Sequence, residues 1–175
     1  MSRTTVPVLI VGGGIGGLSM ALSLARNGVR VHVLERAEKF GEIGAGLQFG
    51  PNASRALDAL GVYDDILPLA VVPERAVMMD AVAGTPLTTL QFGKPFVRRY
   101  GYPYLVLHRS DLLDALLRHC LNHDLISMES RRLVVDAEVR SDGASVFCAD
   151  GSVYEAEALI AADGLHSTLR RKVID

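Results

Sequence analysis

The feature that most constrains the fold is a cluster of glycines directly after a short apolar run. Residues 6–11 are uncharged and rich in valine, leucine and isoleucine, which is typical of a buried parallel strand. The glycines follow in the pattern Gly12-x-Gly14-x-x-Gly17, and residues 15–27 then predict a helix that is apolar on all sides. A second strand is predicted directly after that helix. This order of strand, glycine turn, helix and strand indicates a compact βαβ unit.

Each glycine of the pattern has its own physical role in such a unit. Gly12 allows the tight turn out of the strand, Gly14 lets a pyrophosphate approach the helix N-terminus, and Gly17 lets the helix pack closely on the strands. Glu35 follows the second predicted strand (29–34), 18 residues after Gly17. Its carboxylate can accept hydrogen bonds from ribose hydroxyls and would repel a 2′-phosphate. The spacing therefore predicts binding of FAD or NAD in preference to NADP, with a glycine turn that only packs as the alternative.

Composition and charge exclude several other functions. The 175 residues include 18 Lys+Arg and 20 Asp+Glu, and the net charge of −2 gives no basic surface for nucleic acid. The glycines and Pro7 interrupt the apolar N-terminal segment, which argues against a signal peptide or a membrane-spanning helix. Two cysteines, Cys120 and Cys148, are too few for a disulfide framework and fit a reducing compartment. We therefore expect a cytoplasmic protein that binds neither nucleic acid nor membrane.

The rest of the chain departs from the simple βα alternation of an NAD dehydrogenase. A second glycine-bearing loop at residues 41–50 precedes a short helix that stops at Gly61. Beyond it the pattern predicts a β-hairpin, a return strand, a helix capped by Ser110, two further hairpin turns and a last buried strand, at residues 74–92, 104–107, 111–121, 141–151 and 159–162. An Asp-Gly pair follows that last strand.

Four segments of the chain occur together and in order: VLIVGGGIGGLSMALSLARNGVRVHVLER, GEIGAGLQFGPNASRALDALGV, LHRSDLLDAL and LIAADGLHSTLRRKV. They cover most of residues 6–62 and 104–173, and as a set they are highly specific. The chain resembles the N-terminal half of the flavin-dependent aromatic hydroxylases, the salicylate and hydroxybenzoate monooxygenase family. The resemblance implies an α/β, Rossmann-like FAD/NAD(P)-binding fold of three layers. Residues 1–72 and 104–175 would form its FAD-binding part, and residues 73–103 a partial β-rich substrate-domain insertion.

The resemblance also implies FAD as a tightly bound cofactor and assigns residues to it. These residues are Gly12, Gly14, Ile15, Gly17, Glu35, Arg36, Ala45, Gly46, Leu47, Arg109, Asp163 and Gly164. The adenosine end would lie on the glycines and Glu35, with Arg36 beside the adenine ribose. Residues 45–47 would approach the flavin ring, and Arg109 would contact the pyrophosphate and ribityl region. The Asp163-Gly164 motif is associated with both FAD and the nicotinamide donor.

From the residues alone, two of these positions have simpler explanations. Arg109 follows a strand end, where a charge often faces a ligand in an α/β sheet, but a surface salt bridge with Asp111 or Asp114 is the better account from the residues alone. Asp163 directly follows a buried strand, and a turn-forming Asp-Gly pair is the better account on spacing alone. Function at these two positions is therefore implied by the resemblance only.

Neither a metal site nor a set of catalytic residues is predicted. His119 and His123 are four residues apart on a predicted helix, but Cys120 points about 100° away from His119 and no further ligand has suitable spacing. No Ser-His-Asp or Cys-His catalytic set can be identified from the order of the residues. The catalytic residues therefore stay unassigned, and no metal is expected.

The resemblance implies an enzyme that hydroxylates a phenolic aromatic acid with NADH or NADPH and O2. In that family the catalytic acid–base residues lie in a C-terminal half, so we expect a fragment that is inactive alone. That half also returns a strand beside the first strand, so we expect an exposed edge there, covered by a homodimer or by the missing half. Two alternatives are a non-catalytic nucleotide-binding module and another flavoenzyme of the same scaffold, an epoxidase or an isoprenoid reductase.

Overall fold

Two structural units divide the chain in the computed structural model, which describes residues 3–41 and 45–174. The first unit joins residues 1–42 to residues 113–175, and the second comprises residues 43–112. This division follows packing alone. The division of the sequence by function, at 1–72, 73–103 and 104–175, stays a prediction.

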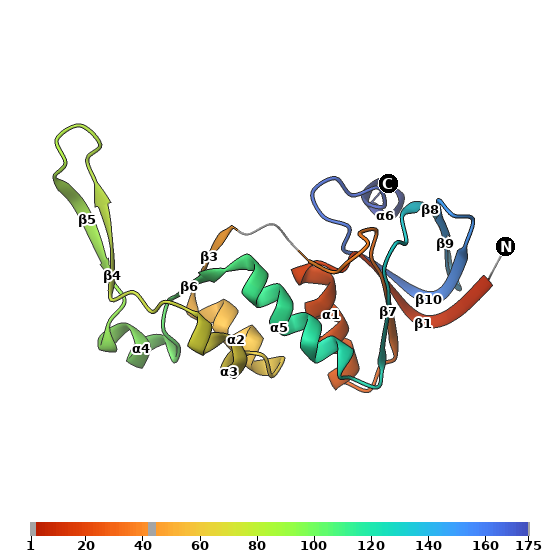
Figure 1. The fold of residues 1–175 in the computed structure, drawn as a ribbon, viewed down its shortest axis with the longest axis horizontal. Coiled ribbons are helices and arrows are strands. Elements are labelled where there is room, and N and C mark those ends of the chain that lie inside the picture. Colours follow the sequence, from red (N-terminus) through yellow and green to blue (C-terminus); the bar gives the residue numbers. More distant parts are fainter. Residues whose placement is uncertain (1–2, 42–44, 175) are drawn as a thin grey trace. The chain divides into compact units, whose positions relative to one another are not determined.

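A six-stranded sheet forms the centre of the first unit (Figure 1), with the strand order β7-β2-β1-β10-β9-β8. The strands are β1 (Arg3–Val11), β2 (Val31–Leu34), β7 (Ile126–Glu129), β8 (Val134–Arg140), β9 (Gly143–Cys148) and β10 (Val153–Ala161). β7, β2, β1 and β10 run parallel, whereas β8, β9 and β10 form an antiparallel meander. The predicted α/β class with a parallel sheet is confirmed.

The position of β1 corrects one expectation. β1 pairs with β10 from Arg3↔Val153 to Val11↔Ala161, and its second half pairs with β2 on the other side. It is therefore an interior strand, and the two edges of this sheet are β7 and β8. The expected exposed edge at the first strand is wrong, because the strand predicted at 159–162 begins at Val153 and covers it. The predicted homodimer loses this physical basis.

Successive residues of a strand point to opposite sides of the sheet, so the sheet has two faces to cover. Both faces are covered. The helix α1 (Ile15–Arg26) packs against β1, β2 and β7 on one face, as Figure 1 shows. On the other face, Leu9, Val11 and Leu34 share a core with side chains from the meander, among them Val146 and Tyr154. The helix predicted at 15–27 and the strand predicted at 29–34 are both present, each slightly shorter than predicted.

The second unit consists of two antiparallel strand pairs and short helices. β3 (Gly46–Phe49) pairs with β6 (Leu105–His108), and β4 (Arg75–Met79) pairs with β5 (Pro86–Gln91) in the predicted hairpin. The helices are α2 (Pro51–Ala59), α3 (Tyr63–Ile66), the 3₁₀ turn η1 (Leu67–Leu69) and α4 (Lys94–Tyr100). β3, α3 and α4 were not expected. Each is only four to seven residues long, and β3 lies where glycines suggested a loop.

The long helix after β6 begins earlier than predicted. α5 spans Arg109–Leu121, so Ser110 lies inside its first turn and is not its N-cap. Cys120 on α5 is buried, and its thiol lies 3.6 Å from the carbonyl oxygen of Leu18 on α1. Cys148 is also a buried free thiol. A last short helix, α6 (Arg170–Ile174), follows the Asp-Gly motif, and none of the helices in the described residues is long and apolar enough to cross a membrane.

The core on the meander side should control the stability of the first unit. Leu9 is 0% exposed there, so Leu9→Ala is expected to lower the free energy of unfolding by about 2–5 kcal/mol. Leu121→Ala is the matched control, because Leu121 is 65% exposed and its loss should cost less than about 0.5 kcal/mol. Urea denaturation of the two variants measures both values. Equal losses would contradict this assignment of the core.

Candidate cofactor-binding site

The turn between β1 and α1 requires glycine at two positions for steric reasons. Gly12 has φ +112°, and a Cβ atom there would overlap the carbonyl oxygen of Ala162. A Cβ at Gly17 would overlap the carbonyl oxygen of Gly12. The tight turn predicted at Gly12 and the close packing predicted at Gly17 are therefore both present. Together they bring the start of α1 against the end of β10.

Gly14 differs from these two glycines because space beside it is open. It is the N-cap of α1 in an extended conformation, and a Cβ there would have no protein atom within 4 Å. Among the described residues no side chain caps this helix end, and its first turn, which begins at Ile15, contains no acid. The free N–H groups of that turn and the helix dipole favour an anion. The residues present thus fit a cofactor pyrophosphate.

Glu35 lies directly after β2 and is tied to the glycine turn. Its Oε2 accepts a hydrogen bond from the N–H of Gly13 at 2.7 Å, and its Oε1 accepts one from the N–H of Ala37 at 2.8 Å. A carboxylate offers about four acceptor positions, so both oxygens can also accept from ribose hydroxyls. Arg36, the next residue, is exposed. The link between Glu35 and Gly13 was not predicted, because spacing along the chain carries no signal for it.

The Asp-Gly motif lies next to the glycine turn. Asp163 Oδ1 accepts from the hydroxyl of Ser167 at 2.6 Å, and Oδ2 accepts from the N–H groups of Thr168 and Leu169 at 2.7 and 3.2 Å. Burial alone would raise the pKa of Asp163, but these hydrogen bonds outweigh it and the pKa is lowered. Gly164 has φ +83°, which a residue with a Cβ adopts only with strain. Asp163 therefore orders this turn, as the simpler explanation predicts, beside Gly12.

The remaining predicted residues form a separate group in the second unit. The N–H of Arg109 donates to the carbonyl oxygen of Ala45 at 2.8 Å, and Gly46 is paired with His108. Gly46 and Leu47 lie in β3, so part of the predicted loop is a strand. Residues 42–44, the centre of that loop, lie outside the described residues. The structure thus places Ala45, Gly46, Leu47 and Arg109 in the second unit, while the other eight predicted residues lie in the first unit.

The histidines and cysteine considered for a metal site do not form one. Within residues 3–41 and 45–174, no group of three or more His, Cys, Asp or Glu is placed to hold a metal ion. Burial raises the pKa of the Cys120 thiol to about 12, so the thiol stays protonated and unreactive at neutral pH. His123 accepts a hydrogen bond at Nδ1 from the N–H of Leu125 at 3.2 Å, which is a local role at the end of α5.

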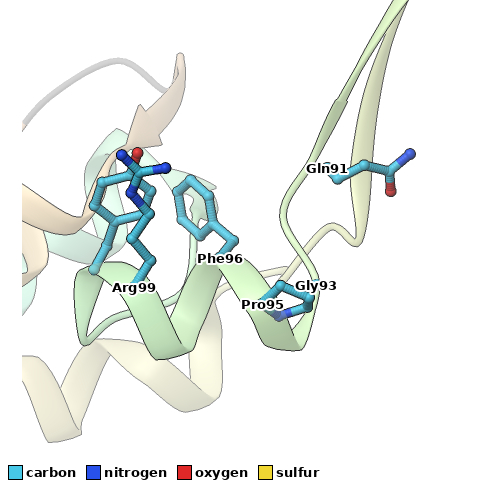
Figure 2. Close-up of a pocket in the computed structure, with 6 residues that line it drawn as sticks. Gln91, Gly93, Pro95, Phe96 and Arg99 are labelled. Carbon is cyan, nitrogen blue, oxygen red and sulfur yellow. The ribbon is translucent and has the colours of Figure 1, made fainter.

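A hollow of about 450 Å³ lies beside α4 in the second unit (Figure 2). Gln91, Gly93, Pro95, Phe96, Arg99 and Tyr100 line it. Figure 2 shows Phe96 and Arg99 on the same side of α4, and the Arg99 guanidinium lies 5.4 Å from the centre of the Tyr100 ring. None of the residues predicted to bind the cofactor lines this hollow. A guanidinium beside aromatic rings is chemically suited to an aromatic anion.

The comparisons with known proteins all indicate the same family. Residues 5–174 match the family described as FAD binding domain. The chain is 42% identical over 166 residues to a 3-hydroxybenzoate 6-hydroxylase from Klebsiella oxytoca, covering 95% of this chain and 42% of that protein. It is 36% identical over 177 residues to a salicylate hydroxylase from Pseudomonas putida, covering 99% of this chain and 39% of that protein. The chain spans about two fifths of the length of these curated relatives.

Solved structures agree with the curated relatives. Klebsiella pneumoniae HpxO in complex with FAD and uric acid matches with a TM-score of 0.80 and 30% identity, over 95% of this chain and 41% of that chain. p-Nitrophenol 4-monooxygenase PnpA from Pseudomonas putida DLL-E4 matches with a TM-score of 0.87 and 25% identity, over 97% of this chain and 44% of that chain. The resemblance to flavin-dependent aromatic hydroxylases and the Rossmann-like FAD-binding fold are confirmed. The individual cofactor contacts stay predictions.

The lowered pKa of Asp163 makes the stability of this turn depend on pH. A carboxyl whose folded pKa is below its ordinary value of 3.8 stabilises the fold above that value and stops doing so as pH falls through the folded pKa. The difference in unfolding free energy between the native chain and Asp163→Asn should therefore be constant above about pH 5 and shrink below about pH 4. Urea denaturation at several pH values measures it. A difference in unfolding free energy that stays constant down to the lowest pH at which the chain still folds would contradict the assigned hydrogen bonds.

Proposed function

Because this chain belongs to the family of FAD-binding domains, we propose that it holds FAD for an enzyme that hydroxylates a phenolic aromatic acid with NADH or NADPH and O2. One observation carries the proposal: the uncapped, open N-terminus of α1 at Gly14 lies beside a carboxylate, Glu35, that is hydrogen-bonded to the same turn. That pair of groups is suited to a pyrophosphate and its neighbouring ribose. When bound, FAD would take electrons from the nicotinamide donor and activate O2.

The residues of this chain would bind and orient the cofactor. The N–H groups of the first turn of α1, from Ile15 onward, would donate to the pyrophosphate, and Glu35 would accept from the ribose hydroxyls. The negative charge of Glu35 disfavours a 2′-phosphate at that position, which supports FAD over a phosphorylated dinucleotide. Cofactor contacts by residues 45–47 and Arg109, which lie in the second unit, stay a prediction from the resemblance.

The substrate class is inferred from the relatives. Two of them are named for 3-hydroxybenzoate and salicylate, which are both phenolic acids. We infer a small phenolic acid as the substrate of the complete enzyme. We also place the chain in the cytoplasm, which its two buried free thiols, Cys120 and Cys148, support.

Substitution at Gly14 separates cofactor binding from folding. Because a Cβ at Gly14 has no protein atom within 4 Å, Gly14→Ala should leave the melting temperature nearly unchanged. The same methyl group would project into the space proposed for the pyrophosphate and should weaken FAD binding by about tenfold or more, which corresponds to about 1.4 kcal/mol. Ser23→Ala is the control, since Ser23 is exposed on the same helix and lies beyond the first turn that is proposed to bind the pyrophosphate.

Quenching of FAD fluorescence measures the two dissociation constants, and circular dichroism measures the melting temperatures. Equal FAD affinity in the two variants would contradict the proposed position of the pyrophosphate. A fall in melting temperature for Gly14→Ala alone would show that the glycine is needed for the fold.

Ligand perturbation of the flavin spectrum tests the substrate class. We expect 3-hydroxybenzoate and salicylate to shift the absorbance of the FAD complex of the complete enzyme, and benzoate, which lacks the phenolic hydroxyl, to shift it less. A shift caused only by an isoprenoid lipid would favour the epoxidase or isoprenoid reductase alternative. No shift with any of these compounds would favour a nucleotide-binding module without catalysis.

A further inference from the structure

The segment after β7 is hydrogen-bonded to the residues around Glu35. The N–H of Glu35 donates to the carbonyl oxygen of Glu129 at 2.8 Å, and the N–H of Arg132 donates back to the carbonyl oxygen of Glu35 at 2.8 Å. The N–H of Arg131 donates to the carbonyl oxygen of Ala37 at 2.9 Å. Residues 129–132 thus hold the main chain on both sides of the Glu35 side chain.

This arrangement requires an unusual backbone conformation at Arg131. Its φ is +58°, and it is the one non-glycine residue with positive φ among residues 3–41 and 45–174. Such a conformation is strained for a residue with a Cβ and persists only where the surroundings enforce it. Here the hydrogen bond to Ala37 and an ion pair between the Arg131 and Glu38 side chains accompany it.

The side chain of Glu129 is the centre of a polar cluster beneath this segment. Its Oε2 accepts from Nε of Arg132 at 2.7 Å and from the hydroxyl of Tyr154 at 2.8 Å. Its Oε1 lies 3.0 Å from Nε2 of His32 on β2. Arg132 also forms an ion pair with Asp150 in the turn between β9 and β10. The cluster therefore connects β2, β7 and β10 below Glu35.

Two members of the cluster, His32 and Tyr154, are buried, whereas the side chains of Glu129 and Arg132 are 33% and 31% exposed. His32 is 7% exposed, its ring is stacked on Tyr154 at 5.6 Å, and desolvation lowers its pKa against the opposing effect of Glu129. Burial would raise the pKa of Glu129, but hydrogen bonds from Arg132 and Tyr154 outweigh it and the pKa is lowered. Glu129 is therefore an ionised acceptor at neutral pH, and removing its charge leaves its donors poorly satisfied.

We infer that Glu129, with Arg132 and Tyr154, is a positioning group that fixes the Glu35 carboxylate for the cofactor's ribose. The inference rests on the proposed function, because it takes Glu35 as the ribose acceptor. Glu129 itself acts through the main chain of residues 129–132 and through Glu35. A small displacement of the Glu35 main chain moves its carboxylate away from Gly13, and positioning errors below 1 Å weaken a binding site.

The first test uses the chain without cofactor. Amide hydrogen exchange, read by NMR, reports on the N–H groups of Gly13 and Ala37, which both donate to the Glu35 carboxylate. Glu129→Gln should speed exchange at these two amides by about fivefold or more relative to Ala162, whose N–H donates to Val11 elsewhere in the turn. Tyr154→Phe should have the same effect to a smaller degree.

The control for this exchange test is Glu157→Gln, an exposed residue on β10 that should leave all three amides unchanged. Unchanged exchange at Gly13 and Ala37 in Glu129→Gln overturns the inference. An equal increase at Ala162 also overturns it, because that result is general destabilisation.

The second test is a double-mutant cycle on FAD affinity, measured by fluorescence quenching. Glu35→Gln should weaken binding by about tenfold, and Glu129→Gln by about threefold to tenfold. If Glu129 acts through Glu35, adding Glu129→Gln to Glu35→Gln should cause little further loss. The same fold loss in both backgrounds overturns the inference. A Glu35→Gln variant that binds FAD normally contradicts the proposed role of Glu35 itself, whereas the exchange test still decides the positioning role.

Discussion

The close approach of the glycine turn to the end of β10 is the constraint on which the rest of the site depends. Gly12 can lie against the carbonyl of Ala162 only without a side chain, and Gly17 can lie against Gly12 only for the same reason. These contacts bring the N-terminus of α1, the acid after β2 and the Asp163 turn to one end of the parallel strands. Ligands bind at that end in open α/β sheets. The close contacts at Gly12 and Gly17 thus fix the turn, and the space beside Gly14 in that turn stays open.

Much of this end of the molecule could be predicted from the sequence, because its signals are local. The apolar run, the glycine spacing and Glu35 lie within 30 residues of one another, and each has a direct physical reason. The partner of β1 could not be predicted in the same way. Val11 pairs with Ala161, and only the end of that strand, from residue 159, carried a clear buried pattern. The expected exposed edge followed from the resemblance, which implies that the strand beside β1 comes from a C-terminal half.

The groups that hold Glu35 were also outside the reach of sequence analysis. Glu129 and Arg132 are three residues apart, but their partner Tyr154 lies on another strand, and charged residues between strands usually indicate a solvated surface. Arg131 has a left-handed backbone conformation that its residue type does not signal. In the second unit, β3 has the composition of a glycine loop and forms a strand because β6 lies beside it. Tertiary pairing decided each of these cases.

The central claim is that this chain binds FAD. The most direct test is an absorbance spectrum of the purified native chain, recorded after the chain is incubated with FAD and the excess FAD is removed. We predict a flavin band that corresponds to nearly one FAD per chain, since the glycine turn and Glu35 both lie in the first unit and are hydrogen-bonded to each other. A folded, colourless protein that takes up no added FAD would contradict the account.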